Sequence, residues 1–151
     1  MCGKMNFFRK CMVIVSCLVL FQAFGSKKTG KDDNIDITKY KGNKVIVGTE
    51  TGSGNFREET IILHSGQVYS HNKVNKEYKY EKTLKKSEVR HIFAMLGRAP
   101  ITSFNHPGTS SSFIEGYSRD KVTYYYIWGE QGVTVPGYIL EDYTEILKMV
   151  R

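Results

Sequence analysis

Cysteine is missing from most of this 151-residue chain, because its three cysteines, Cys2, Cys11 and Cys17, all lie near the N-terminus. If that segment is removed from the working protein, the rest can form no disulfide bond. It also has no thiolate to bind a metal ion and no cysteine nucleophile. Beyond its opening segment the chain has no apolar run of the length that a membrane-spanning helix needs.

Catalytic and metal-binding motifs are also missing. The four histidines are not arranged as H-E-x-x-H or in another metal-ligand spacing, no serine lies in G-x-S-x-G, and Gly48–Gly54 does not match a phosphate-binding loop. The sequence therefore predicts no cofactor and no metal site. The histidines are His64, His71, His91 and His106.

The N-terminal segment has the pattern of an export signal. Basic residues at 4, 9 and 10 precede an uncharged, mostly apolar run over 11–24, and Ala23 and Gly25 are small residues at the positions that a signal peptidase reads. We expect residues 1–25 to be a signal peptide and the protein to be periplasmic or secreted.

Two alternatives for this segment stay open. Ile14-Val15-Ser16-Cys17 resembles a bacterial lipobox, so lipidation at Cys17 would make the protein a membrane-anchored lipoprotein, although the residues after Cys17 are still apolar. An uncleaved anchor is the other alternative, but the apolar run is shorter than the roughly 20 residues of a membrane-spanning helix. The membrane is thus expected as a partner only through this leader.

The chain after the leader suits one domain. Residues 26–36 are polar and without periodicity, which predicts a flexible spacer, and 37–151 are expected to form a single folded domain. The leader carries three of the 22 basic residues and none of the 15 acids, so the rest has a net charge of +4 instead of +7. That modest charge, together with export, argues against nucleic acid as a partner. The basic run over 73–90 is interpreted as a solvated face, with an anionic partner as the alternative.

The periodicity predicts strands followed by a helix, two more strands and a last helix. Strand patterns cover 44–51, 56–64, 68–69 and 77–83, with a further hairpin over 112–118 and 122–128 around Arg119-Asp120-Lys121. Apolar residues at helical spacing follow Ser87, a plausible N-cap, and recur from Ile139 to Val150. The expected fold is α+β: an antiparallel sheet, made of a meander plus a hairpin, with two packed helices and an irregular loop over 100–108.

The strand Thr123–Trp128 is unusual because both of its faces are apolar or aromatic. One interpretation is a central strand covered by helices, with phenol groups that reach the rim. The other is an open aromatic platform of Tyr124, Tyr126 and Trp128 for sugar rings, peptide or protein. These three residues are the candidate binding residues.

The chain carries a set of turn and strand-end motifs: Gly48–Gly54, Ile62–Tyr69, Asn105–Gly108, Phe113–Glu115 and Trp128-Gly129. Together they resemble those of a group of small exported bacterial proteins. The similarity spans roughly Val45 to Leu147, and Thr109 stands where the group usually has asparagine. It implies a fold and an exported location, and it carries over no catalytic residue.

Two functional hypotheses follow. The first is a non-catalytic binding module whose partner is a protein or glycan of the cell envelope or the exterior. The second is a small hydrolase that uses His64 or His106 with a nearby serine or carboxylate.

Overall fold

The computed structural model describes residues 35–52 and 55–151 of the chain. Asp36–Arg151 form one compact unit. The predicted signal peptide, the lipobox at Cys17 and most of the predicted spacer lie outside the described residues. Within the described ranges, no helix has both the length and the apolar character needed to cross a bilayer.

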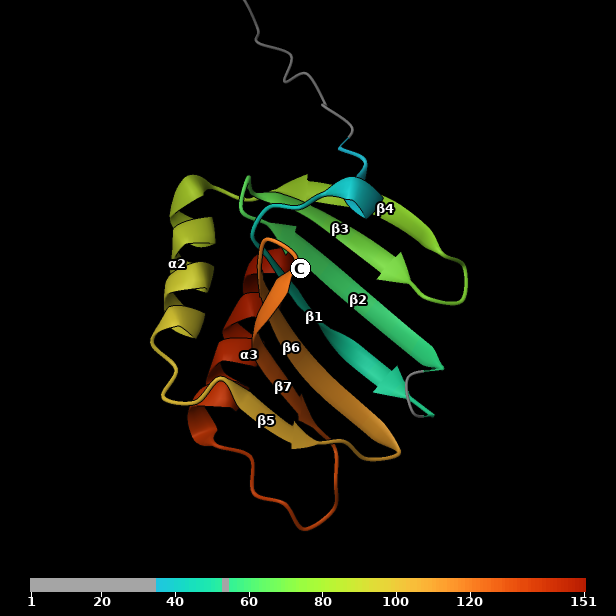
Figure 1. The fold of residues 1–151 in the computed structure, drawn as a ribbon, viewed down its shortest axis with the longest axis vertical. Coiled ribbons are helices and arrows are strands. Elements are labelled where there is room, and N and C mark those ends of the chain that lie inside the picture. Colours follow the sequence, from blue (N-terminus) through green and yellow to red (C-terminus); the bar gives the residue numbers. More distant parts are fainter. Residues whose placement is uncertain (1–34, 53–54) are drawn as a thin grey trace, which may run out of the picture. The chain divides into compact units, whose positions relative to one another are not determined.

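The unit is a seven-stranded sheet with two helices, which confirms the α+β class (Figure 1). The strand order across the sheet is β4-β3-β2-β1-β6-β7-β5, and all neighbouring pairs but one are antiparallel. The strands are β1 (Lys44–Thr51), β2 (Phe56–Leu63), β3 (Gln67–Asn72), β4 (Glu77–Thr83), β5 (Ser103–His106), β6 (Ser110–Ser118) and β7 (Lys121–Trp128). The helices are α2 (Lys86–Gly97) and α3 (Gly137–Val150), and a short 3-10 helix, η1 (Ile37–Lys39), precedes β1.

Strand β5 corrects the expected irregular loop over 100–108. Its four residues pair in parallel with Tyr125–Trp128 of β7, so the sheet is mixed. The physical reason is that α2 carries the chain from one edge of the sheet to the other, and β5 then runs along the free edge of β7 (Figure 1). Strand β5 is only four residues long, Ser103–His106, which is too short for a clear alternating pattern.

Helix α2 begins two residues earlier than the capping pattern suggested. Its N-cap is Lys85 and not Ser87, and the Lys85 backbone N–H donates to Glu88 Oε2 at 2.7 Å. Glu88, at the third helical position, thus accepts from the backbone N–H of the N-cap residue. This is the glutamate half of a capping box, in which an N-cap serine would accept from the backbone N–H of the third helical residue.

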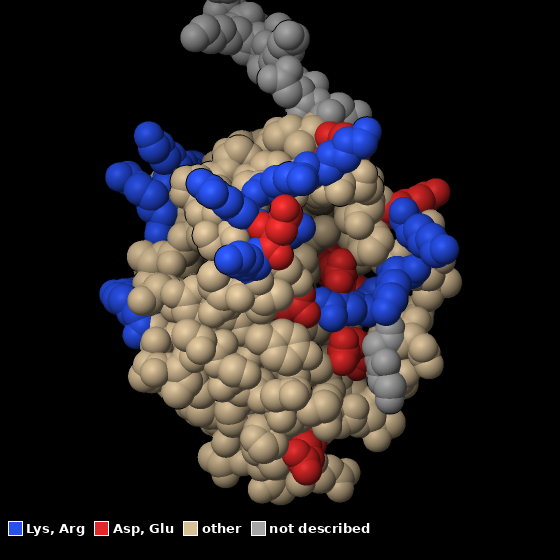
Figure 2. Space-filling view, viewed as in Figure 1, with Lys and Arg blue, Asp and Glu red and all other residues tan. Residues whose placement is uncertain are grey.

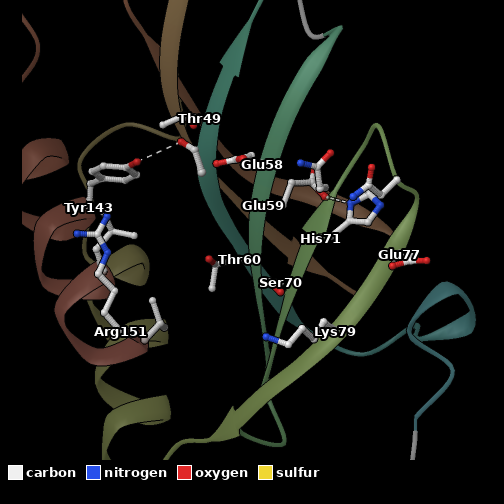
Figure 3. A pocket seen from close by; sticks show the side chains of 15 residues that line it. Thr49, Glu58, Glu59, Thr60, Ser70, His71, Glu77, Lys79, Tyr143 and Arg151 are labelled. Carbon is white, nitrogen blue, oxygen red and sulfur yellow. Dashed lines mark hydrogen bonds and ion pairs between the residues drawn. The ribbon is translucent and has the colours of Figure 1, made fainter.

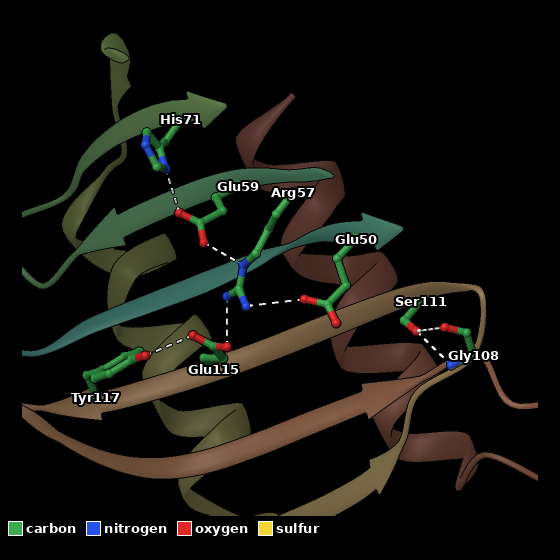
Figure 4. Close-up of polar contacts among 8 residues, drawn as sticks. All are labelled: Glu50, Arg57, Glu59, His71, Gly108, Ser111, Glu115 and Tyr117. Atoms are coloured by element: carbon green, nitrogen blue, oxygen red, sulfur yellow. Dashed lines mark hydrogen bonds and ion pairs between the residues drawn. The ribbon is translucent and has the colours of Figure 1, made fainter. Parts of the chain in front are cut away.

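The two faces of the sheet are different. The helix-side face carries the main core, in which α2 and α3 pack on alternate residues of the central strands. The opposite face, here called the open face, carries the intervening residues, including Arg57 of β2 and Glu115 of β6 (Figure 4). Core residues from the sheet are Val45, Val47, Ile62, Val68, Ile114 and Tyr126, and those from the helices are Val89, Ile92, Met95, Leu96, Ile139 and Ile146.

Candidate functional site

A cavity of about 500 Å³ lies between helix α3 and the helix-side face of strands β1 to β4 (Figure 3). We call it the α3 groove. Thr60, Ser70 and Lys79 extend toward it from three neighbouring strands, and Tyr143 and Arg151 lie across from them (Figure 3). Its polar floor consists of Thr49, Glu58, Thr60, Ser70, Asn72 and Lys79, and its wall of Tyr143, Leu147, Val150 and Arg151.

The groove exists because β1, β2 and β3 each change from apolar to polar residues on their helix side. The change lies at the same level in β2 and β3 and one helix-side position further along in β1, where Val47 is opposite Thr60. In β1, β2 and β3, the helix-side residue beyond Val47, Ile62 and Val68 is Thr49, Thr60 and Ser70 respectively. The register aligns the last two, since Thr60 is directly opposite Ser70. Adjacent strands lie about 4.8 Å apart, so these side chains form a closely spaced polar surface.

Several floor side chains are free to bind a ligand. Within the described part of the chain, Thr49, Glu58 and Thr60 make no side-chain hydrogen bond or ion pair. Ser70 donates to Glu81 Oε1 at 2.7 Å and keeps its acceptor capacity, and Asn72 Oδ1 accepts from a backbone N–H and keeps its amide donors. The floor therefore offers donors and acceptors side by side.

The wall of the groove is held rigidly by Tyr143. Its hydroxyl donates to the backbone oxygen of Gly48 at 3.2 Å, and its ring meets the ring of Trp128 edge to face, with centroids 5.1 Å apart. Side chains fixed in this way lose little conformational entropy when a ligand binds. The geometry supports binding, because it presents a preformed concave surface.

On the open face, Arg57 lies among three carboxylates (Figure 4). Its guanidinium nitrogens lie 2.7 Å from Glu115 Oε1, 2.6 Å from Glu59 Oε1 and 3.4 Å from Glu50 Oε2, although the contact with Glu59 lacks the alignment of a hydrogen bond. The guanidinium carbon is 3.8 Å from the centre of the Phe113 ring. Figure 2 shows acidic and basic side chains gathered beside each other on this face.

Neighbouring groups extend this network. Tyr117 donates to Glu115 Oε2 at 2.8 Å, and burial together with the charge of Glu115 raises the pKa of Tyr117 to about 12. Burial alone would lower the pKa of Arg57, but the hydrogen bond to Glu115 and charge attraction from Glu115 and Glu59 raise it. On the other side, His71 lies 2.8 Å from Glu59.

We interpret the Arg57 network as a structural brace of the sheet. Its members come from β1, β2, β3 and β6, and their charged atoms are directed toward one another. Their side chains are only 8% to 17% exposed. Among the described residues, no group of three or more histidine, cysteine or acidic side chains is placed to hold a metal ion.

The three predicted binding residues face the helices. Tyr126 is fully buried, and its hydroxyl donates to the backbone oxygen of Ile101 at 2.6 Å, while Tyr124 and Trp128 are partly buried against the core. The aromatic face of strand β7 is thus covered by the helices, as in the first of the two interpretations of this strand. A binding role for the exposed edges of Tyr124 and Trp128 stays a prediction.

The histidines proposed for hydrolysis lie apart from each other. His64 is exposed and contacts the Phe93 ring, whereas His106 Nδ1 lies 3.0 Å from Glu130 Oε2 on the surface. The serine nearest in sequence with a buried side chain, Ser111, bonds to Gly108 instead. A base with a carboxylate partner is present at His106, but the Ser111 hydroxyl bonds to the Gly108 backbone and not to this histidine.

The basic run over 73–90 is spread over different surroundings. Lys82 Nζ donates to the Met149 backbone oxygen at 2.7 Å and thereby binds the C-terminal end of α3, while Lys79 pairs with Glu81 at 3.1 Å. An anionic partner for this run stays a prediction.

Sequence reasoning missed the α3 groove. The available signal was the change from apolar to polar residues along each of three strands, but how these changes line up across the sheet depends on the register. No protein-family model, curated protein or solved structure matches this chain.

Proposed function

We propose that this protein is an exported, non-catalytic binding module of the bacterial cell envelope and that it binds its ligand in the α3 groove. The observation that carries the proposal is the convergence of free polar side chains from β1 and β2 on a concave surface with a rigid wall. Clefts of a few hundred Å³ with a small number of converging polar groups are the usual sites for small ligands. Trp128 takes part indirectly, because it packs against Tyr143.

The hydrolase alternative has weaker support. It requires a nucleophile within reach of a base, and the geometry around His64 and His106 offers a carboxylate partner only to His106. Neither histidine lines the groove. A hydrolase would also convert the ligand, so the same experiment separates the two functions.

A binding experiment with matched variants tests the role of the groove. Thr49→Arg places a bulky charge on the groove floor, and Thr123→Arg makes the same change at another exposed strand position, on the open face. The full chain and both variants are incubated with envelope extract, and retained molecules are identified by mass spectrometry. We expect one ligand to be retained unchanged by the wild type and by Thr123→Arg but not by Thr49→Arg.

Two results would contradict the proposal. Equal retention by all three proteins would exclude the groove as the contact surface. Release of a cleaved product, abolished by His106→Ala, would favour the hydrolase instead.

Export is tested separately. Expressed with its leader in a bacterial host, the protein is expected in the periplasm with a new N-terminus near Ser26. Intact mass measurement would instead find a lipid-modified Cys17 if the lipoprotein alternative holds. A soluble cytoplasmic product that retains Met1 would contradict the export proposal.

A further inference from the structure

The α3 groove has the size of a small-ligand site. Its volume of about 500 Å³ lies within the range of about 300 to 1,000 Å³ that small-molecule sites occupy. A stable protein interface would instead bury about 800 Å² on each partner, over a broader surface than this groove. We therefore consider ligands that fit inside the groove and ask which chemistry its side chains recognise.

The charges that line the groove come close to balance. Glu58 and Glu77 bring two negative charges and Arg151 brings one positive charge, while Lys79 is offset by its ion pair with Glu81 at 3.1 Å. A third acid, Glu59, lies against Arg57 and His71 in the network of the open face. A strongly anionic or cationic ligand would need an excess of the opposite charge, so the balance favours a ligand without net charge.

The neutral groups of the floor suit hydroxyl groups. A hydroxyl donates one hydrogen bond and accepts two, and an amide side chain also does both. Thr49 and Thr60 have free hydroxyls, Asn72 has free amide donors, and Ser70 can still accept. A ligand with many hydroxyls can pair with both the donors and the acceptors of the floor. A purely apolar ligand would leave these groups without hydrogen bonds, which costs binding free energy.

The wall provides an apolar surface opposite this floor. Leu147 and Val150 lie on the same side of α3 as Tyr143, whose ring is fixed by Trp128 and by the hydrogen bond to Gly48. A sugar ring combines hydroxyls at its edge with an apolar C–H face. It could therefore face the aromatic and aliphatic wall while its hydroxyls reach the polar floor.

From these four features we infer that the α3 groove binds a neutral, polyhydroxylated ligand, namely a short uncharged glycan. This inference rests on the proposed function and adds the chemical class of the ligand. Recognition comes from hydrogen bonds of the floor and from contact of a ring face with the α3 wall. Charge attraction contributes little, so affinity does not depend strongly on salt.

Trp128 is the only tryptophan of the chain and touches the groove wall through Tyr143, so its fluorescence reports on binding. The full chain is titrated with three neutral probes, maltotriose, cellotriose and chitotriose. Trigalacturonate serves as the anionic probe and Gly-Ser-Gly as the zwitterionic peptide probe. Titration up to about 10 mM detects a Kd of about 1 mM, equivalent to about −4 kcal/mol.

We expect saturable binding of at least one neutral probe. Its Kd should rise about tenfold in Thr49→Arg, which blocks the floor, and stay within about twofold in Thr123→Arg. Raising the salt from about 0.1 M to 0.5 M should change the Kd less than about twofold, because screening acts on charge attraction.

Other outcomes overturn the inference. Preferential binding of trigalacturonate or Gly-Ser-Gly, lost in Thr49→Arg, would refute the glycan but keep the groove as a binding site. Absence of binding by all three neutral probes would refute the glycan as well, and the extract experiment then decides on the binding function independently. If a neutral probe binds and Thr49→Arg leaves its Kd unchanged, the glycan binds elsewhere on the protein. The groove would then be neither the binding site of the proposed function nor the glycan site.

Discussion

Replacement of Arg57 by methionine is expected to destabilise the domain strongly. Methionine keeps much of the volume of the side chain but removes the positive charge, which leaves Glu50, Glu59 and Glu115 close together and without their common partner. Removing one partner from a buried charge pair typically costs about 3 to 5 kcal/mol. The network is partly open to water, since the Arg57 side chain is 17% exposed, so we expect the lower end, about 3 kcal/mol.

Urea unfolding measures this effect. With an m-value of about 1.5 to 2 kcal/mol per molar urea, the midpoint should fall by about 1.5 to 2 M. Lys79→Met is the matched control, because it removes an ion pair with a largely exposed lysine, for which less than about 1 kcal/mol is expected.

A double variant separates lost attraction from uncompensated charge. Glu115→Gln removes the carboxylate that is least exposed in the network, with a side chain 8% exposed. Arg57→Met combined with Glu115→Gln should therefore cost about 1 to 2 kcal/mol less than the sum of the single changes. If Arg57→Met alone lies within about 0.5 kcal/mol of Lys79→Met, the network is not a brace and the reasoning is refuted.

Three further predictions concern packing and pH. Gly48→Ala should cost about 2 kcal/mol in urea unfolding, because its Cβ would overlap the Glu58 backbone oxygen, whereas Gly137→Ala, with open space around its Cβ, should be neutral or slightly stabilising. Equal effects of the two alanines would contradict this. Burial raises the pKa of Tyr126 to about 12, above about 10 for an exposed tyrosine, so the folded state holds this proton more tightly than the unfolded chain. Its contribution to stability is complete below pH 10 and is lost as the pH rises toward 12 and above, which melting temperatures across this range should show, with a smaller decline in Tyr126→Phe. Trp128→Ala should lower the unfolding free energy by about 3 kcal/mol, as expected for loss of a large side chain packed on the core, and an unchanged melting temperature would instead favour an open aromatic platform.

The local pattern of the sequence was enough to predict the fold class and most elements. Runs such as Lys44–Thr51 are rich in β-branched residues and end at glycine turns, and the stripe from Ile139 to Val150 has helical spacing, so each segment favours its structure by itself. For the strand Thr123–Trp128 the same pattern left a helix-covered strand and an open aromatic platform as alternatives, and only the structure shows Tyr124, Tyr126 and Trp128 on the face that packs with the helices. The pattern failed for β5, because a four-residue edge strand is held by pairing with β7 and not by a pattern of its own.

The network and the groove were decided by the tertiary structure. Arg57 and Glu115 are 58 residues apart, and only the register of β1 between β2 and β6 brings them within 2.7 Å. The groove likewise depends on Thr60 facing Ser70 while Tyr143 of α3 reaches Gly48. Alternation along a strand is a property of neighbouring residues and can be read from the chain, whereas register and helix placement come from many weak, distant contacts that act together.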